Sequence, residues 1–257
     1  MKRHRLDDKT WNKLYACLQT ITGIYAGQAE KSRRFLDAVH WIMCTGAPWA
    51  DLPAELGKGN SVFKRFANWS DKAVWGQLHE QRIDDPDLEW LLLDGTVVRA
   101  HPCAAGARLA QGSQAEQALG KRVGGFSTKI HVVVDAHGNP LRLVPTGGQR
   151  ADSTQALALL EGFQLAAVLA DRGYDTDKIL DFLAQNHAEA VIWGALWAKK
   201  NRLIQRQTDW HIYKVRYLVE CLMNKIKQYR RIFSRFEKYT ARHMAFLSFA
   251  SALIWLR

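Results

Sequence analysis

The strongest constraint on the fold is a change in the pattern of apolar residues near residue 89. Before that position, apolar residues recur at helical spacing over residues 11–22, 31–45 and 60–79, without the alternation that marks a strand. After it, short apolar runs of strand length are separated by turn residues and by segments of helical spacing. We therefore predict an all-helical domain over residues 1–88 and a larger α/β domain over residues 89–257.

The second domain is predicted to hold three strands followed by alternating helices and strands. Turn residues between Asp135 and Pro140 indicate that the second and third strands pair as a hairpin. Asp152 or Ser153 is expected to cap the next helix, and Asp175 the one after it. The expected elements are strands at 90–94, 128–134 and 141–145, a helix ending at Phe163, a strand at 166–170, a helix at 175–186, a strand at 190–193 and then a long helix. This is the element order of the ribonuclease-H-like fold, a mixed sheet flanked by helices.

The helical domain contains a segment that is compatible with a helix-turn-helix reader of DNA. Residues 46–57 hold a turn and a short helical segment, and Asn60 or Ser61 is placed to cap the helix that follows. Lys64 and Arg65 lie on that helix and are the candidate DNA contacts if the motif holds. A plain helical bundle explains the same pattern equally well, so both interpretations stay open.

Four residues near the C-terminus, which we call the quartet, share one side of a predicted helix: Tyr213, Arg216, Glu220 and Lys227. At about 100° per residue their offsets fall at about 0°, 300°, 340° and 320°. The opposite side carries the apolar residues Leu218, Val219, Leu222 and Ile226. A helix that buries this apolar side would aim one carboxylate, two cations and a phenol at the same place, which is typical of a phosphate and metal site.

The spacing Tyr-x2-Arg-x3-Glu-x6-Lys resembles the signature of bacterial insertion-sequence transposases of the DDE class, and the chain is similar to their insertion sequence five family. The resemblance covers nearly the whole chain. It includes the segments Thr45-Gly-Ala-Pro-Trp49, Trp90-Leu-Leu-Leu-Asp94-Gly-Thr96, Gly124-Gly-Phe-Ser-Thr-Lys-Ile-His131, Val168-Leu-Ala-Asp171-Arg-Gly-Tyr174 and Ala250-Ser-Ala-Leu-Ile-Trp255.

The resemblance implies a catalytic triad of Asp94, Asp171 and Glu220 that holds two Mg²⁺ ions, for which Mn²⁺ substitutes. The predicted fold explains how they meet, with Asp94 on the central strand, Asp171 at the end of the adjacent parallel strand and Glu220 on the helix across them. Three carboxylates suit Mg²⁺, which prefers hard oxygen ligands. Two such ions about 3.5 to 4 Å apart activate the attacking oxygen and stabilise the leaving oxygen of a phosphodiester.

Positive charge is concentrated near the C-terminus. The chain has a net charge of +11, and residues 199–242 alone hold 13 Lys or Arg against three acids. Such a block indicates a surface for a polyanion, although a solvated helix face gives the same pattern. Lys129 and His131 are expected on one face of the second strand, beside Asp94; His131 either assists proton transfer or is structural. The candidate DNA contacts outside the helical domain are Lys129, Tyr213, Arg216, Lys225, Lys227, Arg230 and Arg231.

The predicted function is a transposase that binds the terminal inverted repeats of its element in double-stranded DNA, cleaves the ends and joins the 3′-hydroxyls to target DNA. Pairing two ends implies a homodimer on DNA. The alternatives are a nuclease of the same fold and a DNA-binding protein without catalysis. Widely spaced cysteines, no secretory signal and no apolar stretch of membrane-spanning length favour a bacterial cytoplasmic protein associated with the nucleoid.

Overall fold

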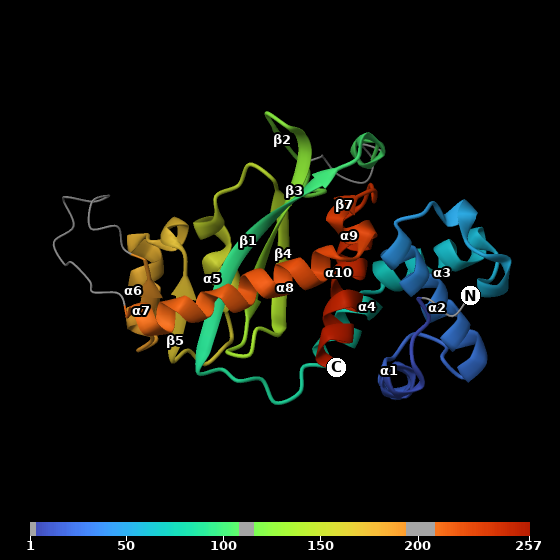
Figure 1. The fold of residues 1–257 in the computed structure, drawn as a ribbon, viewed down its shortest axis with the longest axis horizontal. Helices are drawn as coiled ribbons and strands as arrows, with labels where there is room; N and C mark the ends of the chain where they lie inside the picture. The colour runs from blue at the N-terminus through green and yellow to red at the C-terminus, as the bar shows by residue number, and fades with distance from the viewer. Residues whose placement is uncertain (1–3, 108–115, 194–208) are drawn as a thin grey trace.

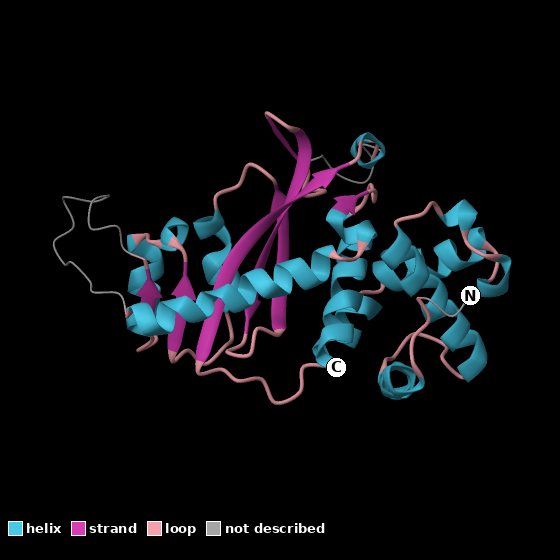
Figure 2. Cartoon of the chain, viewed as in Figure 1, coloured by secondary structure: helices cyan, strands magenta, loops and turns pink. Residues whose placement is uncertain are grey.

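The computed structural model describes residues 4–107, 116–193 and 209–257 (Figure 1). Its first part is made of helices alone, and the rest is built around a sheet with helices on both sides (Figure 2). The predicted fold class, a mixed sheet flanked by helices and preceded by a helical region, is therefore confirmed. Among the helices of these ranges, none combines the length and apolar composition that crossing a lipid bilayer requires.

The N-terminal part contains α1 (Asp8–Thr20), α2 (Ala29–Thr45), η1 (Trp49–Asp51), η2 (Ala54–Leu56), α3 (Gly59–Asp71) and α4 (Val74–Glu80). A single helix over 60–79 is wrong, because Ala73 has a left-handed backbone (φ 54°) that separates α3 from α4. The predicted cap is also wrong, because Lys58 precedes the first turn of α3. The helix-turn-helix remains a prediction.

The sheet is centred on one long strand, β1. The strands are β1 (Trp90–Ala100), β2 (Gly120–Arg122), β3 (Gly125–Val134), β4 (Pro140–Gly147), β5 (Ala167–Ala170), β6 (Glu189–Ile192) and β7 (Ser234–Arg235). β1 pairs antiparallel with β3 on one side and parallel with β5 on the other. β4 pairs antiparallel with β3, which confirms the predicted hairpin, and β6 pairs parallel with β5.

Short turns and helices connect and cover these strands. They are η3 (Pro102–Ala105), η5 (Asp152–Gln155), α5 (Ala156–Leu160), η6 (Arg172–Tyr174), α6 (Asp177–Gln185), α7 (Trp210–Tyr213), η7 (Lys214–Arg216), α8 (Tyr217–Lys227), α9 (Arg230–Phe233) and α10 (Thr240–Trp255). Two predicted caps are wrong. Thr176 caps α6 in place of Asp175, and Ala151 precedes η5, so that neither Asp152 nor Ser153 is its cap.

Each face of the sheet has its own apolar core. Side chains of a strand alternate between faces, so Leu92 and Leu169 pack in the core that includes α8 and α10, whereas Leu91 and Leu93 pack in the core that includes α5 and α6. Burial of apolar surface at roughly 25 cal/mol per Å² stabilises both layers. Because Asp94 follows Leu92 by two residues, its side chain projects to the α8 face.

The buried helix α10 joins the sheet to the N-terminal helices. Phe246 stacks on Phe66 of α3 with ring centroids 4.6 Å apart, and Phe249 lies 5.2 Å from Trp75 of α4. Both phenylalanines are fully buried in the core that also contains Leu92 of β1. The N-terminal helices therefore share one apolar core with the α8 face of the sheet. The boundary at residues 88 and 89 stays a prediction.

Candidate active site

The pairing of β1 with β5 brings Asp94 and Asp171 to equivalent positions. Leu92 is the register partner of Leu169 on the parallel neighbour; Asp94 lies two residues further along β1, and Asp171 directly follows the last residue of β5 with an extended backbone. Both side chains therefore project toward the α8 face. Asp94 Oδ1 accepts the backbone N–H of Gly95 at 2.7 Å, and Asp171 Oδ1 accepts that of Gly173 at 2.8 Å, which caps η6.

Arg216 connects Asp94 to Glu220. Its Nη1 donates to Asp94 Oδ2 at 3.1 Å and its Nη2 donates to Glu220 Oε1 at 2.6 Å. The elements α7, η7 and α8 follow one another without a break and run across the sheet (Figure 1). Tyr213 and Lys214 keep right-handed helical dihedral angles at the junctions. The backbone that carries these four residues is therefore one continuous right-handed helical stretch, as predicted, although it divides into three successive elements.

Negative charge accumulates around Asp94. Burial raises the pKa of this carboxyl, and the charges of Asp171 and Asp152 raise it further, against the Gly95 N–H and Arg216. Burial also raises the pKa of Tyr174, whose hydroxyl feels Asp152, Asp94 and Asp171. The hydroxyl of Tyr174 on η6 is thus within reach of negative charge from both faces of β1, from Asp94 and Asp171 on one side and from Asp152 on the other.

The donors at this site suit a hard divalent cation. Asp94, Asp171 and Glu220 supply carboxylate oxygens, the ligands that Mg²⁺ prefers. Within the described ranges, no three His, Cys, Asp or Glu side chains lie close enough together to hold one metal ion. Arg216 accounts for part of that spacing, since its guanidinium lies between Asp94 and Glu220. In this arrangement Arg216 occupies Oδ2 of Asp94 and Oε1 of Glu220.

The opposite face of β1 carries a second charged cluster that sequence reasoning missed. Lys129 and His131 lie on one face of β3, as predicted, but the expected place beside Asp94 is wrong. His131 is the register partner of Gly95, so both side chains lie on the face of the sheet opposite Asp94. Lys129 Nζ donates to Asp152 Oδ2 at 2.9 Å. Burial opposes ionisation of Asp152, but His131 and Lys129 hold its pKa below the usual range. The sequence signal was the alternation of Lys129 and His131; nothing in the sequence indicated that Asp152, expected as a helix cap, would join them.

The predicted DNA contacts near the C-terminus divide into exposed and buried cations. Lys225 and Arg230 are exposed, and Lys227 is partly exposed. The prediction for Arg231 is corrected, because this side chain is buried, pairs with Glu237 at 2.6 Å and donates to the carbonyls of residues 46 and 47. Residues 199–208 of the basic block lie outside the described residues.

An aromatic cluster stands beside the start of the quartet. Ring centroids of Trp193, Trp210 and Tyr213 lie 5.6 to 6.3 Å apart, and both tryptophans are exposed. The guanidinium of Arg216 lies 5.9 Å from the Tyr213 ring. Exposed rings of this kind can stack on nucleic acid bases. The tryptophans were missed because their sequence positions, one after a strand and one before the quartet, give no hint that the fold brings them together.

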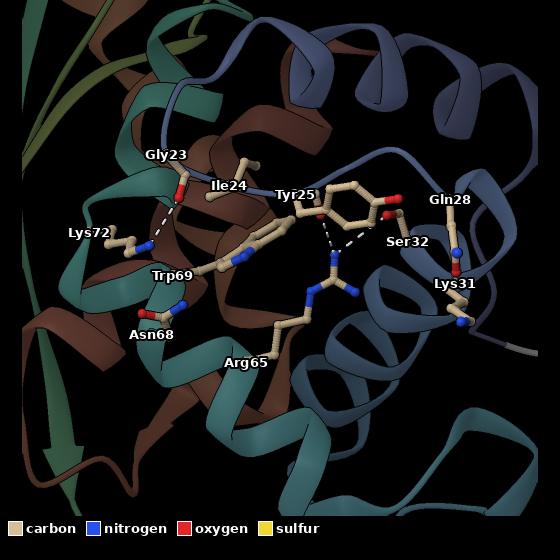
Figure 3. A pocket seen from close by; sticks show the side chains of 10 residues that line it. All are labelled: Gly23, Ile24, Tyr25, Gln28, Lys31, Ser32, Arg65, Asn68, Trp69 and Lys72. Atoms are coloured by element: carbon tan, nitrogen blue, oxygen red, sulfur yellow. Dashed lines mark hydrogen bonds between the residues drawn. The ribbon is translucent and has the colours of Figure 1, made fainter.

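The two N-terminal candidates have different environments. Lys64 is exposed on α3, whereas the Arg65 guanidinium lies 4.3 Å from the Phe35 ring centroid and 5.0 Å from that of Trp69. Arg65 also forms part of the wall of a pocket of about 450 Å³ (Figure 3). The pocket is lined by Gly23, Ile24, Tyr25, Gln28, Lys31, Ser32, Arg65, Asn68, Trp69 and Lys72. Its lining thus includes three cations and no carboxylate.

Comparisons with known proteins show the family to which the chain belongs. A family model described as a transposase DDE domain matches residues 85–255, and one described as a putative transposase of the IS4/5 family matches residues 6–79. A putative transposase for insertion sequence element IS6501 from Brucella ovis is 42% identical over 133 residues, which are 51% of this chain and 100% of that protein.

Two further relatives extend the comparison. A putative transposase for insertion sequence element IS402 from Burkholderia cepacia is 30% identical over 141 residues, which cover 49% of this chain and 62% of that protein. An uncharacterized protein from Sinorhizobium fredii is 36% identical over 113 residues, which cover 44% of this chain and 90% of that protein. The DDE model alone spans well over half of the chain, including both aspartates and the quartet. The chain therefore belongs to the insertion-sequence transposases with a DDE catalytic domain, enzymes that cleave and transfer DNA.

Proposed function

We propose that this transposase binds the terminal inverted repeats of its own element, cleaves the DNA there and joins the freed 3′-hydroxyls to target DNA. The observation that supports the proposal is that Arg216 on the helical side contacts both Asp94 and Glu220, while Asp171 follows the strand next to Asp94. Asp94 lies on β1, and Asp171 directly follows the end of the adjacent parallel strand β5. A transposase of this kind is predicted to act as a homodimer, since two element ends need two active sites.

We assign Asp94, Asp171 and Glu220 as ligands of two Mg²⁺ ions, with Mn²⁺ able to substitute. When bound, such ions supply a nucleophilic oxygen and charge stabilisation at phosphorus. Asp94 is the best candidate for a shared ligand, since it lies between Asp171 on the neighbouring strand and Arg216 on the helix side. Arg216, once released from one carboxylate, has a free donor edge for a phosphate oxygen.

The DNA-binding surface is proposed to have two parts. The first follows the quartet and comprises Tyr213, Arg216, Lys225, Lys227 and Arg230, of which Lys225 and Arg230 are exposed. Lys129 is a weaker candidate, because it is paired with Asp152. The second part is α3, where Lys64 is exposed and Arg65 lies in the cationic pocket. Because that pocket contains no carboxylate, its chemistry suits a DNA phosphate.

The proposal is tested with labelled element-end DNA and a supercoiled target plasmid. Cleavage and joining should both require Mg²⁺ or Mn²⁺. Ca²⁺ should inhibit both steps, because its larger radius and looser geometry misplace the reacting oxygens. Full activity in excess chelator would contradict the metal mechanism. Cleaved ends with 3′-hydroxyls that never join the plasmid would indicate a nuclease instead.

A further inference from the structure

The residue that follows Asp94 must be glycine because a carboxylate from elsewhere in the chain lies against it. Gly95 points to the face of β1 opposite Asp94. A Cβ atom placed on Gly95 would overlap with Asp152 Oδ1 and would lie 3.4 Å from His131 Nδ1. Asp152 therefore packs directly against the β1 backbone, one residue beyond Asp94.

Two side chains of β3 hold Asp152 in that position. Lys129 Nζ donates to Asp152 Oδ2 at 2.9 Å, and only 11% of the Lys129 side chain is exposed. His131 is fully buried, with Nδ1 3.5 Å from Asp152 Oδ1 and Nε2 2.8 Å from Thr146 Oγ1.

One oxygen of Asp152 is not otherwise used within the described structure. Its Oδ1 and the Nδ1 of His131 are both buried, and neither has a hydrogen-bond partner there. A partly buried carboxylate, with a side chain 26% exposed, that is held by a lysine and a histidine and lies against a glycine is costly to keep for stability alone, since apolar residues could fill this space. Asp152 instead lies against Gly95, the residue after Asp94, on the opposite face of β1, where it can influence the position of Asp94.

We propose that Asp152 is a positioning residue, which fixes the β1 backbone at Gly95 and thereby sets the direction in which Asp94 presents its carboxylate. Asp94 and the backbone N–H of Gly95 are linked at 2.7 Å, so a shift of Gly95 moves the donor that orients Asp94 Oδ1. Groups that orient metal ligands typically change metal affinity or activity by about 10- to 100-fold when removed. This inference rests on the proposed role of Asp94 as a metal ligand.

The test measures Mn²⁺ binding to the full-length protein by calorimetry, without DNA, together with thermal stability. Asp152→Asn keeps the shape beside Gly95 but removes the charge, and should weaken Mn²⁺ binding about tenfold or more. The matched control is Asp135→Asn, a buried aspartate directly after β3 that accepts the backbone N–H groups of His137 and Asn139. The control should lose stability and keep Mn²⁺ affinity.

A double-variant cycle distinguishes positioning from general destabilisation. Gly95→Ala should weaken Mn²⁺ binding, because the new methyl group displaces the Asp152 carboxylate. In Gly95→Ala with Asp152→Ala the methyl group has room, so the combined loss of affinity should be smaller than the product of the two single losses.

Two results would overturn the inference: Asp152→Asn with the Mn²⁺ affinity of the Asp135→Asn control, or a double variant whose losses simply multiply. Asp94→Asn keeps this failure separate from failure of the proposed function. If Asp94→Asn binds Mn²⁺ as the wild type does, the metal-site assignment itself is wrong. If it loses Mn²⁺ while Asp152→Asn keeps it, the assignment stands and only the positioning role of Asp152 is wrong.

Discussion

Arg230 and Arg231 are neighbours in the sequence, yet they belong to different environments. Arg230 is exposed at the start of α9, whereas Arg231 is buried and paired with Glu237. Arg235 is also buried and donates to Thr128 Oγ1 at 2.7 Å, which ties β7 to β3. The basic block that the sequence presents as one surface therefore contains both exposed cations, available to DNA, and buried cations that hold the fold together.

The largest effect should come from the buried member of the pair. Arg231→Met leaves Glu237 buried without its cation, and breaking a buried ion pair on one side costs about 3–5 kcal/mol of unfolding free energy. Arg230→Met should change stability by no more than about 0.5 kcal/mol. Chemical denaturation of both variants tests this contrast. Equal stability of the two would show that the burial of Arg231 has no energetic consequence.

The same contrast recurs on α3 between Lys64 and Arg65. If this helix reads the element end, Lys64→Gln should reduce the preference for end DNA over random DNA by about 1–3 kcal/mol for each base that Lys64 reads. Arg65→Gln should also lower stability, because it removes a guanidinium from the faces of Phe35 and Trp69. Competition binding with both DNAs tests the reader. If both variants keep the wild-type preference for end DNA, α3 is not the element that recognises the DNA sequence.

A smaller effect is expected from the exposed cations of the C-terminal block. Changing Lys225 and Arg230 to glutamine should weaken binding to all DNA sequences alike. The slope of log affinity against log salt should flatten by roughly 0.9 for each phosphate that the variant no longer neutralises. Preference for end DNA should survive, because phosphate contacts position the protein without reading bases. An unchanged slope would show that Lys225 and Arg230 belong to a solvated helix face and do not contact DNA phosphates.

The buried pair should also affect stability in acid. Burial opposes ionisation of Glu237, but His243 and Arg231 lower its pKa from the usual 4.5. A carboxyl with a lowered folded-state pKa stabilises the fold above its unfolded pKa, and this contribution is lost as the pH falls below about 4.5. Glu237→Gln should therefore lose less stability than the wild type between about pH 5 and pH 3. If the wild type and Glu237→Gln lose the same unfolding free energy over this pH range, the pKa of Glu237 is not lowered in the folded protein.

Much of the fold followed from local patterns, and the exceptions have physical causes. The hairpin of β3 and β4 is predictable from its turn residues, and the central place of β1 from the order of the elements. The break at Ala73 is not, since a left-handed alanine has no sequence signature. Nor are β2 and β7, which are too short to show alternation and are defined by their pairing with β3 and β1.

The candidate site shows the same limit. Asp94, Asp171 and Glu220 were predictable from the resemblance and from element order, because each lies at the end or on the face of a recognisable element. The burial of Arg231 depends on Glu237 and on the carbonyl of Gly46, which is 185 positions away in the sequence. The proposed role of Asp152, on η5, depends on its contact with Gly95 of β1. Such tertiary contacts leave no local pattern.

The central claim is that Asp94, Asp171 and Glu220 form one metal-dependent cleavage site. The most direct measurement is the cleavage rate of element-end DNA in Mg²⁺ for Asp94→Asn, Asp171→Asn and Glu220→Gln, with the exposed Asp181→Asn of α6 as the control. Loss of a ligand charge removes several kcal/mol of transition-state stabilisation. Each of the three variants should therefore cleave at least about a thousandfold more slowly while folding normally, and the control should cleave as the wild type does. A rate within about tenfold of the wild type for any of the three would contradict the assignment.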